Sequence, residues 1–266
     1  MSRRRLDAEL VRRGLARSRT EAQAAVRAGL VVVGGRPADK ASRLVGPDEP
    51  LALAAPARRF VSRGGVKLEA ALERFEIDVA GRDCLDVGAS TGGFTDCLLG
   101  RQARRVVAVD VGYGQLDWSL RNDPRVTVLE RTNARRLSAA DLPFAPEVVV
   151  ADLSFISLRL VVPTLTHLAL PGADLVLLVK PQFEADPREV GRGGVVREPG
   201  VWRRVIESVV EACIAAGAAP RAVMPSPIKG PAGNVEFLLH AVKGGTRADL
   251  DVDAVVEEAR GAGGRA

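Results

Sequence analysis

The stretch that decides the fold is "CLDVGASTGGFTDCLL", residues Cys84 to Leu99. It begins with an apolar run typical of a buried strand, passes through a turn that contains three glycines, and ends in a segment with helical spacing. A strand that runs through a glycine turn into a helix is the first unit of a parallel α/β sheet, and ligands bind at such turns. The first question is which ligand this turn suits.

The segments around this stretch alternate between strand and helix patterns. The predicted strands are 84–87, 105–109, 126–129, 147–151, 174–179, 221–224 and 235–239. The predicted helices are 91–99, 115–121, 158–169 and 201–216. Such alternation over about 170 residues favours a doubly wound α/β sheet. No clear helix pattern separates the last two strands, so we expect them to be antiparallel, and we expect the tail 257–266 to be frayed.

Charge divides the chain into two parts. Residues 1–63 contain 14 Lys and Arg against 6 Asp and Glu, whereas the rest of the chain carries 24 against 27. A basic segment of this kind suggests a polyanionic partner. "PARRFVSRGG" has Pro at one end and a glycine pair at the other, which is typical of a linker. We therefore expect a small domain at residues 1–57, a linker at 58–64 and a second domain at 65–266.

The first part has local signals of its own. The apolar spacing from Leu6 predicts a helix that ends near Gly14. "SRTEAQAAVRAG" predicts a second helix, with Ser18 as its N-cap and Glu21 completing a capping box. "LVVVGGRPA" predicts a hairpin, and "PLALAA" a further strand.

Composition excludes several classes of protein. The three cysteines are far apart in apolar segments, which predicts reduced, buried thiols in a cytoplasmic protein instead of disulfides or a zinc site. With only two histidines besides, we expect no metal. The basic N-terminus lacks an apolar signal-peptide region, and the longest apolar runs fall well short of the ~20 residues that span a bilayer.

The spacing of the glycines narrows the choice of ligand. A dinucleotide fingerprint requires glycine where Ser90 stands, and a Walker loop requires a lysine that the turn lacks. Instead, Asp86 precedes the glycines and Asp110 ends the next predicted strand. A carboxylate at the second position accepts both hydroxyls of a ribose, and an acid beside the turn suits a cationic ligand. The pair favours S-adenosylmethionine, and a purely structural turn is the alternative.

The predicted cofactor-binding residues lie in the turn and after the next two strands. Phe94 has an alternative role in the core of its helix, and Asn133 has one as a helix cap. The full set is Asp86, Gly88, Ala89, Ser90, Thr91, Gly92, Gly93, Phe94, Asp110 and Asn133.

Four more charged residues lie at strand ends or near the linker. Asp152 and Lys180 follow buried strands, Glu236 opens the last strand, and Lys67 lies in "GVKLEAAL". If the last strand is antiparallel, its start meets the ends of its neighbours, so Asp152, Lys180 and Glu236 converge. A lysine after "VLLV" is costly to bury without a partner. The residues alone leave two interpretations open, a salt-bridge network that closes the sheet edge and a catalytic group.

In order and segment, these four residues resemble the Lys-Asp-Lys-Glu tetrad of ribose 2'-O-methyltransferases with the FtsJ-like fold. The chain as a whole resembles the TlyA (hemolysin A) family of rRNA 2'-O-methyltransferases. The matching segments are "RLDAELVRRGLARSR", "FVSRGGVKLEAALE", "CLDVGASTGGFTD", "VDVGYGQLDWSLRNDPRV", "LERTNAR", "ADLSFISL", "LVKPQFE", "GGVVREP" and "GPAGNVEF". One departure is in the linker, where the family often has Arg-x-Trp-Val and this chain has Phe60, which lacks the indole N–H donor.

The resemblance implies a fold and an activity. The fold would be a Rossmann-like S-adenosylmethionine-dependent methyltransferase sheet with an antiparallel last strand, preceded by a small α/β RNA-binding domain of the ribosomal-protein type. The activity would be methylation of the ribose 2'-hydroxyl of cytidines in small- or large-subunit rRNA, with rRNA or ribosomal subunits as the partner. The alternatives are a ribosome-assembly RNA-binding protein without activity, and a membrane-lytic hemolysin.

Roles for individual residues follow as hypotheses. Lys180 would act as the base or stabilise the developing oxyanion, and Asp152 would orient it. Lys67 and Glu236 would pair with each other and position the ribose. RNA contacts are expected from a set of arginines, for which a solvated surface is the alternative. This set is Arg3, Arg4, Arg5, Arg12, Arg13, Arg17, Arg19 and Arg63, with Arg188, Arg192 and Arg197 as an extension.

Overall fold

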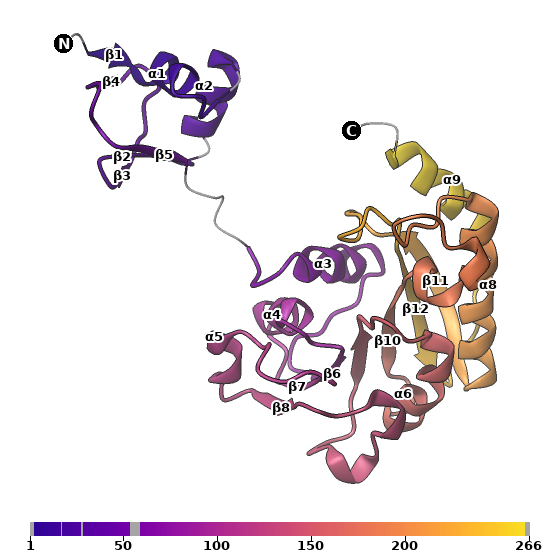
Figure 1. Cartoon of the computed structure of the whole chain (residues 1–266). Coiled ribbons are helices and arrows are strands. Elements are labelled where there is room, and N and C mark those ends of the chain that lie inside the picture. The colour runs from indigo at the N-terminus through magenta and orange to yellow at the C-terminus, as the bar shows by residue number, and fades with distance from the viewer. Residues whose placement is uncertain (1–2, 17, 28, 54–58, 264–266) are drawn as a thin grey trace. The chain divides into compact units, whose positions relative to one another are not determined.

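The chain divides into two units, residues 1–59 and residues 60–266 (Figure 1). The computed structural model describes residues 3–16, 18–27, 29–53 and 59–263. The boundary between the units lies inside the segment expected to be the linker, of which Arg58 is outside the described residues.

The first unit consists of two short helices and two small antiparallel sheets. One sheet pairs β1 with β4, and the other has the order β3-β2-β5. The predicted helices, hairpin and further strand are confirmed, and the hydroxyl of Ser18 accepts the Glu21 N–H at 3.1 Å, as its N-cap role requires. The elements are β1 (Arg4–Arg5), α1 (Leu6–Arg12), α2 (Arg19–Arg27), β2 (Val31–Val33), β3 (Arg36–Pro37), β4 (Leu44–Val45) and β5 (Leu51–Leu53).

The second unit is built on a seven-stranded sheet with the order β11-β12-β10-β9-β6-β7-β8. β12 is antiparallel to both of its neighbours, β10 and β11, and the pairs from β10 to β8 are parallel. The predicted antiparallel last pair is therefore confirmed. The strands are β6 (Asp83–Val87), β7 (Arg105–Val109), β8 (Val126–Leu129), β9 (Val148–Ala151), β10 (Asp174–Val179), β11 (Ala218–Pro225) and β12 (Phe237–Lys243).

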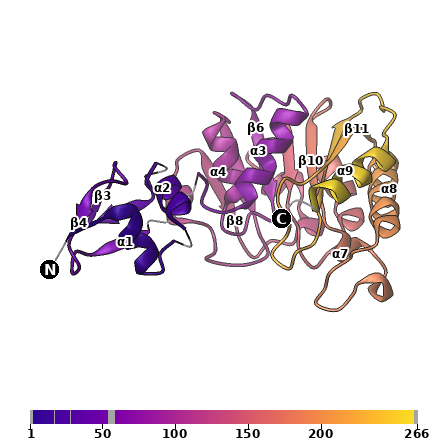
Figure 2. The ribbon, with the colours of Figure 1, turned by 90° about the horizontal axis from the view of Figure 1, so that it is seen from above.

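Helices cover both faces of this sheet. α3, α4 and α5 pack on one face, and α6, α8 and α9 on the other, where α9 lies alongside α8 (Figures 1 and 2). The helices are α3 (Gly64–Arg74), α4 (Gly93–Gly100), α5 (Trp118–Arg121), α6 (Val162–Leu168), α7 (Pro181–Glu184), α8 (Pro199–Ala215) and α9 (Val252–Gly263).

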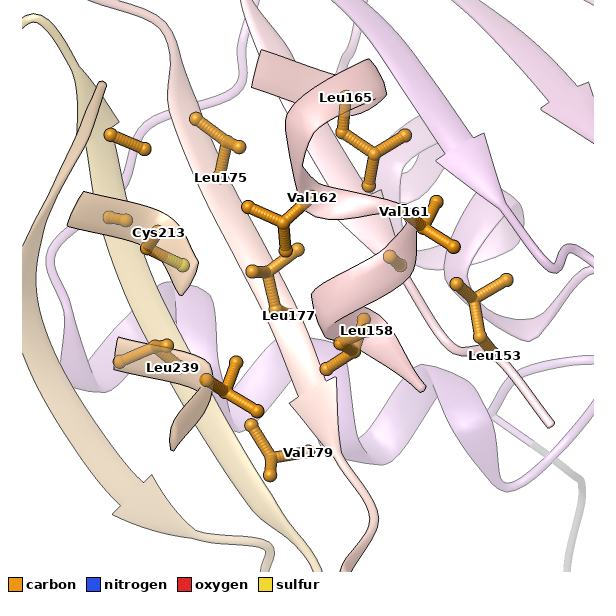
Figure 3. Close-up of a cluster of buried hydrophobic side chains, with 14 of the residues drawn as sticks. Leu153, Leu158, Val161, Val162, Leu165, Leu175, Leu177, Val179, Cys213 and Leu239 are labelled. Carbon is orange, nitrogen blue, oxygen red and sulfur yellow. The ribbon is translucent and has the colours of Figure 1, made fainter. Parts of the chain in front are cut away.

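The hydrophobic core has two layers because the side chains of a strand alternate between the faces of the sheet. In β10, Leu175, Leu177 and Val179 pack against α6 and α8 (Figure 3), whereas Val176 and Leu178 face α3 and α4. The three cysteines are thiols buried in these layers, as predicted.

The tail differs from the prediction. α9 continues through residues 257–263, which were expected to be frayed. Val255, Val256 and Ala259 are buried, and they join the core on the α8 face. The glycines of the tail conceal this helix in the sequence, because its stability comes from a tertiary contact and not from local propensity. Within the described part of the chain, no helix is both long and apolar enough to cross a membrane.

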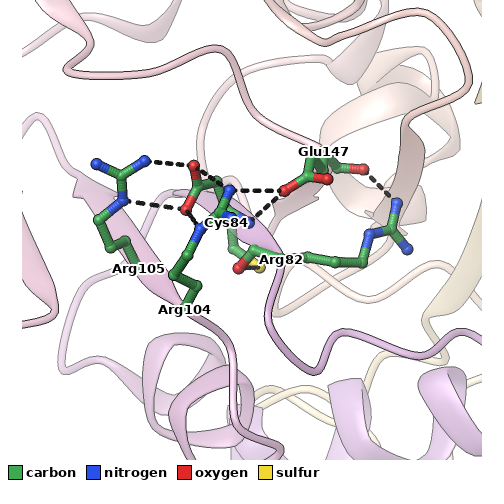
Figure 4. Close-up of polar contacts among 6 residues, drawn as sticks. Arg82, Cys84, Arg104, Arg105 and Glu147 are labelled. Atoms are coloured by element: carbon green, nitrogen blue, oxygen red, sulfur yellow. Dashed lines mark hydrogen bonds and ion pairs between the residues drawn. The ribbon is translucent and has the colours of Figure 1, made fainter.

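A polar cluster closes the sheet at the edge where the parallel strands begin (Figure 4). Arg104 Nε donates to Asp83 Oδ1 at 2.7 Å, Arg105 Nη2 donates to Asp83 Oδ2 at 2.5 Å, and Arg82 Nη2 donates to the Glu147 carbonyl at 2.6 Å. Bonding from Arg104, with that from Arg105, lowers the pKa of the buried Asp83 to about 2. The cluster ties the first residues of β6, β7 and β9 together.

The Asp83→Asn variant tests this cluster. Replacing the carboxylate weakens the charge-assisted bonds, so we expect the free energy of unfolding at pH 7 to fall by about 1–3 kcal/mol. The folded-state pKa lies below the ordinary value, so the stabilisation is present above about pH 4 and disappears as the pH falls towards about 2. Urea denaturation of both proteins across this range measures the difference. A difference that does not shrink in acid would contradict the assignment.

Candidate active site

Five charged side chains reach the same face of the sheet because of strand alternation. Each is two positions along the chain from a core residue beneath α3 and α4, and therefore faces the same side of the sheet. These core residues are Cys84, Ala108, Val150, Leu178 and Leu238. Parallel strands end at one edge, and the antiparallel β12 begins at that edge. The edge therefore gathers Asp86, Asp110, Asp152, Lys180 and Glu236.

The four residues of the predicted tetrad form two ion pairs. Lys67 Nζ, from α3, lies 2.5 Å from Glu236 Oε2, although the two residues are 169 positions apart in the sequence. Lys180 Nζ lies 2.6 Å from Asp152 Oδ1. Val179 pairs with Phe237 in the β10–β12 ladder, so Lys180 and Glu236 occupy the next position along the same pair of strands. The convergence expected from the sequence is present.

The two pairs differ in exposure. The side chains of Lys67 and Glu236 are 7% and 1% exposed, whereas those of Lys180 and Asp152 are 10% and 22% exposed. A buried pair is held by its own geometry, and removing one partner leaves an uncompensated charge. The Lys67–Glu236 pair is therefore suited to fixing α3 against β12, and the Lys180–Asp152 pair is the one that can meet a substrate.

The glycine turn lies directly against this site. Gly88 has φ +85°, and a Cβ on it would overlap the carbonyl oxygen of Asp152. Gly92 has φ +95° at the N-cap of α4, and a Cβ there would overlap the side chain of Leu120. Both positions favour glycine, because a side chain would be strained at these φ values, and at Gly88 it would also meet backbone that cannot move aside. The turn therefore brings the end of β6 into contact with the residue that pairs with Lys180.

Asp110 fixes the turn from the neighbouring strand. Its Oδ2 accepts the Ser90 N–H at 2.8 Å, and its Oδ1 accepts the Gly112 N–H at 2.6 Å. Each oxygen keeps a second lone pair, so the carboxylate can also accept from a ligand.

Asp86 lies beneath the turn. Its Oδ2 accepts the Thr95 hydroxyl at 2.6 Å, and the residue is fully buried. Burial, against the effect of Thr95 and together with the nearby Asp152 and Asp110, raises its pKa to about 7. In the described part of the chain, its Oδ1 has no hydrogen-bond partner. A buried acid with a spare acceptor fits a cationic group at the turn.

Two predicted cofactor residues, Phe94 and Asn133, have the structural roles that the sequence analysis gave as alternatives. Phe94 is 3% exposed and belongs to the core beneath α3 and α4. Asn133 Oδ1 accepts the Arg135 N–H at 3.0 Å, which caps a short helical turn (Ala134–Arg136). Of the remaining positions, Ser90 and Thr91 are exposed, whereas Ala89 and the glycine that opens α4 are buried. Contact of these residues with a cofactor stays a prediction.

The predicted RNA-binding arginines surround two buried acids in the first unit. Arg5 and Arg19 pair with Asp7, and Arg12 pairs with Glu9. Hydrogen bonds from Arg5, against the cost of burial, lower the pKa of Asp7, and bonds from Arg12 lower that of Glu9 to about 2. Both acids thus remain charged and hold the arginines at the surface.

Arg13 differs from these arginines. It bonds Glu9 and also donates to the carbonyls of Gly46, Pro47 and Glu49, so only 20% of its side chain is exposed. It braces α1 against that loop. Of the others, Arg3, Arg4 and Arg63 are exposed, and Arg17 lies outside the described residues.

Sequence reasoning missed two polar residues of the site. Ser154 Oγ accepts from Lys180 Nζ at 3.0 Å, and the buried Glu184 accepts from the Ser157 hydroxyl at 2.5 Å. The segments "ADLSFISL" and "LVKPQFE" contain both residues, but only the packing of these segments against each other shows their contacts.

Comparison with known proteins agrees with this geometry. Residues 60–243 match the FtsJ-like methyltransferase family, and residues 4–51 match the S4 domain. The chain is 54% identical over 236 residues, 88% of each protein, to the 16S/23S rRNA (cytidine-2'-O)-methyltransferase TlyA of Mycobacterium tuberculosis H37Rv. It is 38% identical to Hemolysin A of Brachyspira hyodysenteriae over 240 residues, 90% of this chain and 99% of that protein.

A solved structure is similar along the whole chain. It is that of a protein from Streptococcus thermophilus described as a hemolysin, with 39% identity and a TM-score of 0.76 over 100% of this chain and 98% of that one. Fold and site thus define an FtsJ-like methyltransferase that carries an N-terminal S4 domain. The chain belongs to the TlyA family. The fold class predicted from the sequence is confirmed.

The Asp86→Asn variant tests the burial of this acid. Because its folded-state pKa is raised, from 3.8 to about 7, the unfolded chain loses the proton first, and stability falls as the pH rises between these values. The variant has no such proton to lose. Its free energy of unfolding relative to the wild type should therefore increase from about pH 4 to pH 7, as urea denaturation would measure. A pH-independent difference would place the pKa of Asp86 in its ordinary range.

Proposed function

We propose that the protein transfers a methyl group from S-adenosylmethionine to the ribose 2'-hydroxyl of cytidines in ribosomal RNA, of the small subunit, the large subunit or both. The observation that carries the proposal is the contact between the glycine turn and the Lys180–Asp152 pair. A methyl donor in the turn would lie next to the Lys180–Asp152 pair, which is the more exposed of the two pairs of the tetrad. The activity in the name of the Mycobacterium tuberculosis relative, methylation of the cytidine 2'-oxygen in 16S and 23S rRNA, supports the choice of substrate.

The residues around the turn fit this cofactor. Asp86 offers a spare carboxylate oxygen to a cation, and Asp110 offers free lone pairs to ribose hydroxyls. The turn supplies backbone groups at the start of α4, and Ser90 and Thr91 face solvent there. When bound, S-adenosylmethionine supplies a methyl group on a positively charged sulfur. Because the leaving group is a neutral thioether, the transfer requires no acid from the protein.

The acceptor hydroxyl is a weak nucleophile and must be oriented and deprotonated. Lys180 Nζ donates to Ser154 and is ion-paired with Asp152, which leaves part of the amino group for the 2'-hydroxyl. As a neutral amine Lys180 takes the proton of the hydroxyl on its lone pair, and as an ammonium ion it stabilises the developing oxyanion by donating a hydrogen bond. The Lys67–Glu236 pair keeps α3 and β12 in place beside the ribose.

The basic first unit accounts for recognition of RNA. In this proposal residues 1–57 bind rRNA, residues 58–64 are the linker, and residues 65–266 catalyse the transfer. The arginines around Asp7 and Glu9 contact phosphates, and the same ion pairs that hold them in place reduce the cost of ordering their side chains. The match of residues 4–51 to the S4 domain supports this division.

The Lys180→Met variant tests the catalytic role. We expect kcat for methyl transfer to ribosomal subunits to fall by about 10²–10⁴, while calorimetry finds the affinity for S-adenosylmethionine little changed. Lys243→Met is the matched control, because Lys243 ends β12 at the opposite edge, where it donates to the carbonyls of His167 and Ala169. It should leave kcat unchanged.

The outcomes separate the proposed enzyme from its rivals. A Lys180→Met variant that works at the parent rate removes Lys180 from the mechanism. A wild type that binds subunits but transfers no tritiated methyl group is an assembly factor without activity. Lysis of vesicles without methyl transfer would instead support the hemolysin names of some relatives.

Salt dependence tests the RNA surface. Log affinity for rRNA should fall steeply with log salt, and Arg4→Ala should reduce the slope by about 1 without changing thermal stability. Arg13→Ala is the contrasting variant. It removes the brace between α1 and the loop at Gly46, so we expect it to lower the stability of the first unit. An Arg4→Ala slope equal to that of the wild type would exclude a phosphate contact there.

A further inference from the structure

α7 and the segment 152–159 are joined by contacts at both ends. At the start of α7, Lys180 contacts Asp152 and Ser154. One turn later, Glu184 contacts the same segment a few residues further on. Asp152 and Ser154 therefore lie on a loop whose other end is anchored by the buried Leu158 and bonded to the carboxylate of Glu184.

The carboxylate of Glu184 is fully engaged with this loop. Its side chain is 1% exposed, and it accepts the Ser157 hydroxyl and the Leu158 N–H, each at 2.5 Å. Arg159 Nε lies 3.4 Å away and its guanidinium remains 47% exposed. Burial raises the pKa of Glu184 against the effect of these partners, which shows that the acid is kept in a costly environment.

The conformation of the loop explains why it needs such a contact. Phe155 has φ +64°, a conformation that costs a residue other than glycine about 1–3 kcal/mol and persists only where its surroundings enforce it. The side chain of Phe155 is 91% exposed, and its ring meets that of Phe183 at 5.2 Å between centroids. This exposed ring contact anchors the loop weakly by itself. The Leu158 N–H, three residues after the strained Phe155, donates to Glu184 and so fixes the backbone there, and the Ser157 hydroxyl donates to the same carboxylate.

An apolar side chain at position 184 would avoid the cost of burying a charge, and replacements of this kind are often neutral or stabilising. It could not accept the backbone N–H of Leu158, and that N–H would be left without its partner. The presence of an acid at position 184 is therefore better explained by its bond to the loop at Leu158 than by a contribution to overall stability.

We propose that Glu184 is a positioning residue for the methyl transfer. It fixes the segment 152–158, and with it the Asp152 and Ser154 side chains, against Lys180. The inference rests on the proposed function, and it adds a residue that contacts neither cofactor nor ribose.

The experiment uses the full-length protein with Glu184→Ala, Glu184→Gln and Ser157→Ala. Hydrogen–deuterium exchange of a peptide covering 153–160 should be about tenfold faster in Glu184→Ala. kcat on ribosomal subunits should fall about 10- to 100-fold, because displacement by about 1 Å costs this much, while the affinity for S-adenosylmethionine changes by less than about twofold. Glu184→Gln, whose amide oxygen still accepts from Leu158, should recover part of kcat and of the protection.

Asp83→Asn is the matched control. It also removes a buried carboxylate, but at the opposite edge of the sheet, so it should lower thermal stability with kcat and the exchange of 153–160 unchanged. The inference is wrong if Glu184→Ala leaves the exchange of this peptide unchanged, or if its kcat falls no more than that of Asp83→Asn. Should Glu184→Ala fail to fold, Ser157→Ala, which removes one donor to the carboxylate, decides by the same criteria.

The wild type distinguishes this inference from the function on which it rests. If the wild type transfers methyl groups and the variants do so equally well, the inference alone is overturned. If the wild type transfers none to either subunit, the proposed function falls and the positioning role falls with it.

Discussion

The site depends on one constraint, the alternation of side chains along strands that end at a common edge. Asp86, Asp110, Asp152 and Lys180 all face α3 and α4 because each is in phase with a core residue on that side. A shift of one residue in any of these strands would turn its charged side chain towards α6 and α8. β12 obeys the same rule in reverse, since it is antiparallel and contributes its beginning, Glu236, to that edge.

The charged residues of the tetrad form two ion pairs, which differ in exposure and, in the proposed function, in role. The buried pair of Lys67 and Glu236 joins a helix near the start of the second unit to its last strand, and it is tolerated because each charge compensates the other. The more exposed pair of Lys180 and Asp152 remains accessible. Gly88 lies against Asp152 on one side, and Glu184 accepts from Leu158 on the other. In the proposed function the buried pair thus supports the pair that takes part in the transfer.

Much of the fold was predictable because its signals are local. β7, β8 and β10 begin and end at the predicted residues, since buried parallel strands appear as short apolar runs. α9 was missed because the glycines of the tail suggest a frayed end, whereas the helix is stabilised by packing of residues such as Val256 against α8. Convergence of Asp152, Lys180 and Glu236 was predictable from the antiparallel last strand. The hypothesised pairs Lys67–Glu236 and Lys180–Asp152 are also present, although the helix that carries Lys67, α3, was not among the helices predicted from the sequence.

The sequence by itself determined the strands of the sheet, the glycine turn that excludes a dinucleotide, and the charged residues that end the strands. These features depend on neighbours within a few positions, so a linear pattern records them. Only the tertiary structure decided that Lys67–Glu236 is the more buried pair, that Phe94 belongs to the core, that Arg13 is a brace, and that Glu184 bonds the loop beside Lys180. Those outcomes depend on which helix or loop covers which face, and the contacts join residues that lie far apart in the chain.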